Sequence, residues 1–310
     1  MKDLIKIQEI SLDWRCRAKG ALTGLAIGDA FGAPVEFMDK GSFPKVEKYL
    51  SGGSFGLSKG EWTDDTSHML ALMDSLYEQK GFVAEDFRDK LFSWLYDGAY
   101  TTRGRQIGAG KLTMKSLFHH RTKKTIISPF NLDKHSGNGS VMRLAPIPVF
   151  YYKQGLDIVL QKSAESSMVT HSSELCQQSC KYLGGVIHQL LSGAMKDHLF
   201  DFVKELTHDF DKEFDKLRRL SLDELDVSNS GYCIHSLESA MHAFLTTNSF
   251  LEGLIQVVNY GKDSDTVGAI YGQIAGAFYG YNQIPQELVS GLMKNHEIKA
   301  SIDNLILSSL

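Results

Sequence analysis

The stretch GALTGLAIGDAFG at residues 20–32 has a glycine at every fourth position, and GAIYGQIAGAFYG at residues 268–280 repeats this spacing. Residues four apart lie on one face of an α-helix, so each stretch predicts a helix with a smooth glycine stripe. Glycine inside a helix costs about 1 kcal/mol relative to alanine, which a compensating contact must offset. We therefore expect the stripes to let helix backbones approach closely at the centre of the fold, and stripes facing solvent would disprove this.

The rest of the chain shows the same helical periodicity. Apolar residues recur every three or four positions within 69–77, 87–95, 182–191 and 251–258, whereas two-residue alternation bounded by turns is scarce. We predict an all-α fold, arranged as a single domain over residues 1–310. Residues 196–229 hold 16 charged side chains in 34 positions with apolar residues at helical spacing, which predicts an amphipathic helical segment at the surface.

Composition excludes several classes of protein. The 310 residues are 43 % hydrophobic and 23 % charged, with a net charge of −4, which fits neither a disordered chain nor a nucleic-acid-binding surface. Residues 1–17 contain no apolar stretch of signal-peptide length, and no run of about 18 apolar residues occurs, so we expect a cytoplasmic protein without membrane contact. The spacing of His171, Cys176 and Cys180 fits no common zinc pattern, and we expect reduced, buried cysteines.

Two acidic motifs each precede a predicted helix: EWTDDT at residues 61–66 and KDSDT at residues 262–266. Asp, Ser and Thr cap helix N-termini, which accounts for one such residue at each place. Two carboxylates at one helix end repel each other unless a cation lies between them. The alternative is therefore a site for hard cations such as Mg²⁺ or Mn²⁺, for which carboxylate and hydroxyl oxygens are the preferred ligands.

Three further segments are candidates for the same site. In GDAFGAPVEF, residues 28–37, Asp29 either caps a helix or is solvated, and Glu36 follows a helix-ending turn and could face a cleft. In SGNGSVMR, residues 136–143, the glycine-rich turn is either a plain turn or a source of N–H groups for phosphate. The basic segment 101–135 either covers an anionic ligand or is a solvated loop. No residue next to His171 in the sequence predicts that this histidine acts as a ligand.

Taken in order along the chain, these motifs resemble those of the ADP-ribosylglycohydrolase family, from about Gly20 to Tyr281. The resemblance implies a compact, orthogonal all-α domain with a two-metal cleft that removes ADP-ribose from an acceptor. It also implies roles for particular residues. Glu36 matches a glutamate beside the metals, and His171 matches a ligand-contacting histidine. The ADP-ribose groove is matched by Asn138, Gly139, Ser140 and Met142. The metal ligands are matched by Thr63, Asp64, Asp65, Asp263, Asp265 and Thr266.

The implied chemistry is hydrolysis at the ribose anomeric carbon with two Mg²⁺ or Mn²⁺ ions, in which Asp64, Asp265 or Glu36 accepts a proton from water. The expected substrate is an ADP-ribosylated protein, with arginine as first choice of acceptor, or a small ADP-ribose conjugate; nucleic acid enters only as a modified substrate. One alternative is a non-catalytic member of the fold that binds ADP-ribose or has a structural role. Another is a different Mg²⁺ enzyme such as a phosphohydrolase.

The sequence departs from the family pattern at two places. Lys262 and Ser264 stand in the last acidic motif, where the family often has glycine and threonine. In the loop GRQIGAGKLT, residues 104–113, Gly108 or Gln106 occupies the position of an aspartate that similar enzymes place near the departing group. A guanidinium leaving group favours a carboxylate partner, so this departure bears directly on arginine specificity.

Overall fold

The computed structural model describes residues 13–309; residues 1–12, on which part of the signal-peptide expectation rests, and residue 310 lie outside the described part. Within it the chain is helical, with isolated bridges but no strand, as the periodicity predicts. The α-helices are α1 (Trp14–Gly32), α2 (Asp64–Gln79), α3 (Ala84–Asp97), α4 (Lys111–Lys123), α5 (Pro146–Phe150), α6 (Leu156–Met168), α7 (Glu174–Leu191), α8 (Lys196–Leu206), α9 (Asp215–Arg219), α10 (Cys233–Thr246), α11 (Phe250–Val258), α12 (Ser264–Tyr279), α13 (Gln286–Gly291) and α14 (Asn295–Ser308). Five 3-10 turns, Ala33–Val35, Asp133–His135, Tyr152–Gln154, Lys212–Phe214 and Tyr281–Gln283, connect them.

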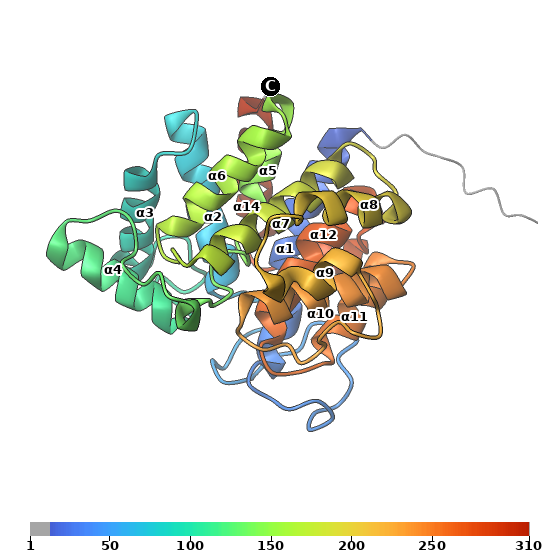
Figure 1. The fold of residues 1–310 in the computed structure, drawn as a ribbon. Coiled ribbons are helices and arrows are strands. Elements are labelled where there is room, and N and C mark those ends of the chain that lie inside the picture. The colour runs from blue at the N-terminus through green and yellow to red at the C-terminus, as the bar shows by residue number, and fades with distance from the viewer. Residues whose placement is uncertain (1–12, 310) are drawn as a thin grey trace, which may run out of the picture.

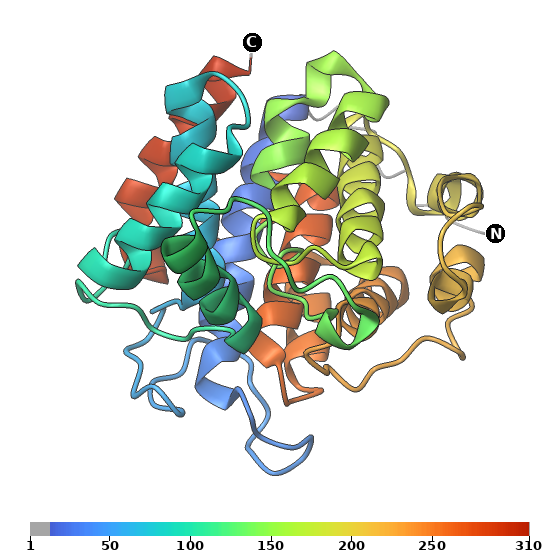
Figure 2. The ribbon, with the colours of Figure 1, turned by 60° about the vertical axis from the view of Figure 1, so that its left-hand side comes forward.

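Helices α1 and α12 lie side by side at the centre of the fold, and the other helices surround them (Figures 1 and 2). Their glycine stripes face each other. A β-carbon on Gly24 would overlap the carbonyl oxygen of Gly272, and one on Gly28 would overlap that of Gly268. The stripes are therefore buried against each other, which confirms the expected close approach of two backbones.

The pairing of the two stripes is antiparallel, because glycines later in α1 meet glycines earlier in α12. The last turn of α1 therefore lies against the first turn of α12. There the Ser264 hydroxyl donates to the Gly32 carbonyl at 3.0 Å, and a β-carbon on Gly32 would overlap the carbonyl of Ser264. The end of α1 and the beginning of α12, more than 230 residues apart in sequence, thus lie at one place, and both carry aspartates there.

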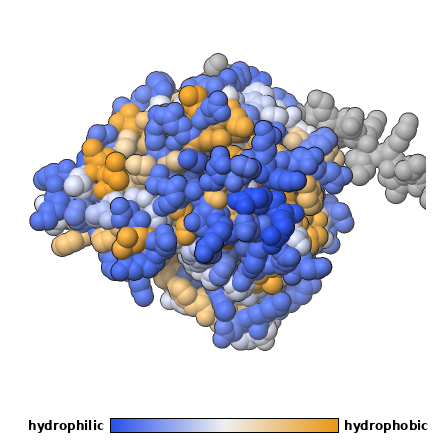
Figure 3. Space-filling model, in the orientation of Figure 1, coloured by the Kyte–Doolittle hydropathy of each residue, from blue (hydrophilic) through white to orange (hydrophobic). Residues whose placement is uncertain are grey.

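The remaining helices cover this central pair. Helix α7 packs against α12 and α6, and α2 packs between α3 and α14. The charged segment 196–229 contains α8 and α9, with Leu199, Val203 and Leu217 buried, and its residues 220–229 form turns without a helix. The most hydrophilic side chains on the face in Figure 3 gather near α9, and no helix among residues 13–309 is long and apolar enough to cross a membrane.

Replacing Gly24 with alanine tests the role of the glycine stripes. Although alanine favours a helix by about 1 kcal/mol, overlap with the backbone of Gly272 should lower the free energy of unfolding by about 2 kcal/mol or more. The measurement is a urea midpoint for each protein. Gly81→Ala is the control, since its β-carbon would lie 3.4 Å from the Tyr151 hydroxyl, in ordinary contact. Equal midpoints for the two variants would contradict the packing argument.

Candidate active site

Asp29 joins α1 to the beginning of α2. Its buried carboxylate accepts the backbone N–H groups of Thr63 and Thr66, each at 3.0 Å, and the hydroxyls of the same residues at 2.9 and 2.6 Å. The N-cap residue Thr63 makes no side-chain capping bond of its own. Asp29 is therefore neither solvated nor a cap of its own helix, because it caps α2 from a neighbouring helix.

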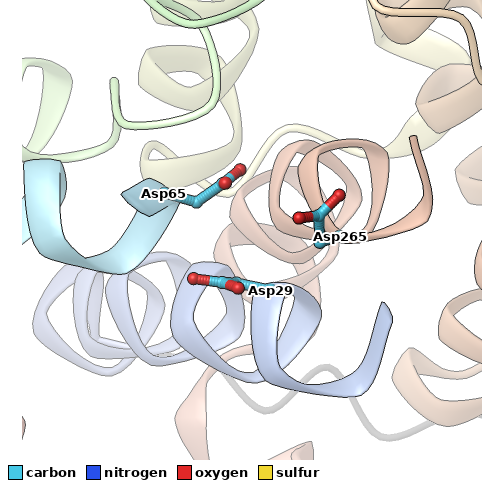
Figure 4. A group of neighbouring side chains, drawn as sticks. All are labelled: Asp29, Asp65 and Asp265. Carbon is cyan, nitrogen blue, oxygen red and sulfur yellow. The ribbon is translucent and has the colours of Figure 1, made fainter. Parts of the chain in front are cut away.

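Carboxylates from four segments converge at this place. Figure 4 shows Asp29, Asp65 and Asp265 approaching one another from α1, α2 and α12, and each has an oxygen within 4.8 Å of the others. A second group consists of Glu36, Asp263 and Asp265, with oxygens within the same distance. Asp265 belongs to both groups, so they form one continuous acidic cluster.

Burial makes this concentration of negative charge unfavourable. It raises the pKa of Asp64 to about 7, with a further contribution from the charge of Asp29. Burial followed by the charge of Asp263 raises the pKa of Glu36 to about 8. Burial and the neighbouring carboxylates also raise the pKa values of Asp65 and Asp265 well above the ordinary range. The cluster therefore lacks compensating positive charge.

The donor set of this cluster fits hard divalent cations. No ion pair among residues 13–309 involves Asp29, Glu36, Asp64, Asp65, Asp263 or Asp265. Two buried oxygens, Asp65 Oδ1 and Glu36 Oε2, have no hydrogen-bond partner. Unpaired buried carboxylate oxygens are costly unless a cation satisfies them, and an all-oxygen set suits Mg²⁺ or Mn²⁺. By contrast, His171, Cys176 and Cys180 form no metal-binding group among the described residues.

The acidic cluster forms part of the wall of a cavity of about 920 Å³. Two predicted metal ligands, Thr63 and Asp65, lie behind this wall, buried at the N-terminus of α2. Ser140 also does not line the cavity, because its buried hydroxyl bonds to Ser167 Oγ at 2.9 Å. The other predicted site residues line it: Glu36, Asp64, Asn138, Gly139, Met142, His171, Asp263, Asp265 and Thr266.

The turn at residues 137–139 is tied directly to the acidic cluster. The Asn138 side-chain amide donates to Asp263 at 2.7 Å and to the Ser236 hydroxyl at 2.9 Å. A β-carbon on Gly139 would lie 2.7 Å from the imidazole of His171, so glycine is required where this ring passes beneath the turn. The structure thus brings the turn and His171 together, although they are about 30 residues apart in sequence.

Several cavity residues belong to segments for which the sequence left alternatives open. Gly108 lies against the Asp64 carboxylate, with φ of +74° and room for no side chain there, whereas Gln106 is exposed and outside the cavity wall. Glycine therefore occupies the position facing Asp64, and no acid stands in this loop. Lys111, Lys115 and Lys134, from the basic segment 101–135, line the cavity together with Lys262.

The fold and the site together define a class of protein: an all-α protein in which converging helix ends place carboxylates beside a partly basic cavity. The comparison of sequences identifies the family. A match to the ADP-ribosylglycohydrolase family spans residues 11–309, and the chain belongs to that family.

Individual relatives agree with this assignment. The chain is 34 % identical to the ADP-ribosylarginine hydrolase Tri1 of Serratia proteamaculans over 93 % of its own length and 78 % of that protein. It is 31 % identical to the ADP-ribosyl-[dinitrogen reductase] glycohydrolase of Rhodospirillum rubrum, over 94 % of its own length and 95 % of the relative. A solved structure described as an ADP-ribosylglycohydrolase-related protein complex superposes with a TM-score of 0.85 at 32 % identity, covering 96 % of this chain and 99 % of that one.

The unpaired cluster predicts how the stability of the metal-free protein depends on pH. Glu36 and Asp64 titrate near pH 8 and 7 in the folded protein but near pH 4 in an unfolded chain. Burial lowers the pKa values of several histidines, which gives the opposite slope below about pH 6.5. Between about pH 6.5 and pH 8 the folded state therefore binds more protons, and the free energy of unfolding falls as the pH rises. We expect the Tm in EDTA to fall across this range and to fall less with saturating Mg²⁺. A Tm in EDTA that rises toward pH 8 would contradict this.

Proposed function

We propose that this protein hydrolyses the bond between the anomeric carbon of ADP-ribose and an acceptor, with an arginine side chain of a protein as first choice. One observation carries the proposal. Four carboxylates without an ion pair among residues 13–309 line a cavity of about 920 Å³ in a chain of this family: Glu36, Asp64, Asp263 and Asp265. Relatives named for ADP-ribosylarginine and for ADP-ribosylated dinitrogen reductase support the substrate class.

The acidic cluster would hold two divalent cations, Mg²⁺ or Mn²⁺. The residues that would hold them are Thr63, Asp64, Asp65, Asp263, Asp265 and Thr266. When bound in such a site, these ions lower the pKa of a coordinated water and bind hydroxyl oxygens of a substrate. The unpartnered oxygens of Asp65 and Glu36 support a site that needs cations to be complete.

Three carboxylates are the candidates for accepting a proton from the attacking water: Glu36, Asp64 and Asp265. All three line the cavity. Glu36 is the best placed, because it lines the cavity and its Oε2 has no hydrogen-bond partner. A general base must lie within hydrogen-bond reach of the proton that it accepts.

The part of the cavity wall next to the acidic cluster would bind the ADP-ribose moiety. Asn138, Gly139, Met142 and His171 line the cavity there, and Asn138 donates directly to Asp263. Four lysines that line the cavity, at positions 111, 115, 134 and 262, would offset the charge of a pyrophosphate. The cavity thus combines carboxylates for the reacting ribose with lysines for the phosphates.

Asp64→Ala and Asp265→Ala test the catalytic assignment. Each should lower hydrolysis of a radiolabelled ADP-ribosylated protein by at least about a hundredfold, equivalent to about 2.7 kcal/mol of barrier. Helical circular dichroism should stay unchanged in both. Asp209→Asn, at a side chain that is 94 % exposed, is the matched control and should keep full activity. Full activity in both cluster variants would refute the proposal.

Removing metal tests the cation requirement and the acceptor together. Treatment with EDTA should abolish hydrolysis, and Mg²⁺ or Mn²⁺ should restore it, because the carboxylates alone cannot orient the ribose.

We would assay ADP-ribosyl-arginine, ADP-ribosyl-serine, O-acetyl-ADP-ribose and ADP-ribosylated nucleic acid side by side. The arginine conjugate should be cleaved fastest. Turnover that persists in EDTA would exclude the metal-dependent mechanism, and preference for another conjugate would correct the acceptor.

A further inference from the structure

Arg143 is a buried cation with no carboxylate partner behind the cavity wall. No ion pair among residues 13–309 includes it, and its guanidinium lies 5.0 Å from the centre of the Phe87 ring. Its polar contacts are with neutral groups: it donates to the Thr170 hydroxyl at 2.6 Å and approaches His68 Nδ1 at 3.4 Å. Burial lowers the pKa of Arg143 to about 10, which leaves it protonated at neutral pH. Burying a charge without an opposite charge is unfavourable, so we looked for a role of Arg143 in the neighbouring cavity.

The Thr170 hydroxyl connects Arg143 to His171. Its oxygen lies 2.8 Å from His171 Nδ1, and Arg143 and His171 are its only hydrogen-bond partners among the described residues. A guanidinium can only donate, so the oxygen of Thr170 accepts from Arg143. Its single hydrogen then has one acceptor within reach, which is Nδ1 of His171. The opposite arrangement would leave a buried hydroxyl hydrogen unpaired, at a cost of about 1–3 kcal/mol.

This chain of donors fixes the tautomer of His171. We infer that Arg143, acting through Thr170, holds His171 as the neutral imidazole protonated at Nε2, so that Nε2–H is a hydrogen-bond donor to an oxygen of the ligand in the cavity. Arg143 and Thr170 are therefore positioning residues. His171 in this state cannot accept a proton at Nε2 and takes no part as a general base.

The surroundings of the ring agree with this arrangement. His171 lines the cavity, and no residue within 13–309 bonds to its Nε2. Burial, with the charge of Arg143 as a second cause, lowers the pKa of His171 to about 3, so the ring is neutral at physiological pH. A β-carbon on Gly139 would lie 3.0 Å from Nε2, so the glycine keeps this edge of the ring accessible. The hydrogen bond from His171 Nε2–H to a ligand rests on the proposed function, whereas the tautomer of His171 does not.

Long-range ¹H–¹⁵N correlation spectroscopy on the uniformly ¹⁵N-labelled wild-type protein tests the tautomer without any substrate. The resonances of His171 are assigned by their loss in His171→Gln. We expect protonated Nε2 and unprotonated Nδ1 for this residue at pH 7. An Nδ1–H tautomer or a doubly protonated ring would overturn the inference. Because this spectrum needs no turnover, its failure is distinguishable from failure of the proposed hydrolase activity.

A pair of variants tests whether the Thr170 hydroxyl connects Arg143 to His171. Thr170→Val keeps the shape of the side chain but removes the hydroxyl, so an Nδ1–H form of His171 should appear and the affinity for ADP-ribose with Mg²⁺ should fall about tenfold, the value of one hydrogen bond. Thr170→Ser keeps the hydroxyl and should restore both the wild-type tautomer and the affinity. Calorimetry with ADP-ribose measures the second readout. A wild-type spectrum and affinity in Thr170→Val would overturn the role of the Thr170 hydroxyl. An Nδ1–H form of His171 in Thr170→Ser would overturn it as well, and this second test does not depend on whether the valine variant folds.

Discussion

The contact between the backbones of α1 and α12 is the constraint on which the rest of the structure depends. Side chains on either glycine stripe would separate the two helices, because a β-carbon there overlaps the backbone of the partner. The antiparallel pairing brings the last turn of α1 to the first turn of α12, and Asp29 then reaches across to cap α2. Three helix ends are thereby held together by backbone contacts and by one buried carboxylate.

This arrangement concentrates negative charge that the protein alone does not compensate. Helix N-termini at α2 and α12 favour anions through their partial positive charge, but that effect is worth about 0.3–1 kcal/mol per group. It cannot offset the crowding of six neighbouring carboxylates, whose pKa values are all raised. The repulsion among these carboxylates lowers the stability of the folded protein when no cation is bound. The rigid glycine packing keeps the cluster assembled under that repulsion.

The fold could largely be predicted from sequence, since the glycine spacing and the apolar periodicity report contacts along single helices. The helices expected after the two acidic motifs and the buried stripes are confirmed, although α2 and α12 begin inside the motifs, at Asp64 and Ser264. What sequence could not supply is the pairing between distant segments. Asp29 caps a helix 34 residues away, and Arg143 reaches His171 only through Thr170. The roles of the predicted metal ligands and substrate-binding residues remain predictions, because proximity alone does not establish what a carboxylate binds.

The most direct test of the account is anomalous diffraction from crystals grown with Mn²⁺, recorded on both sides of the manganese absorption edge. The account predicts two anomalous peaks between the N-termini of α2 and α12, with oxygens of Asp64, Asp65, Asp263 and Asp265 at coordination distance. No anomalous peak at this cluster, in crystals of protein saturated with Mn²⁺, would contradict the claim that the glycine-packed helices assemble a metal site.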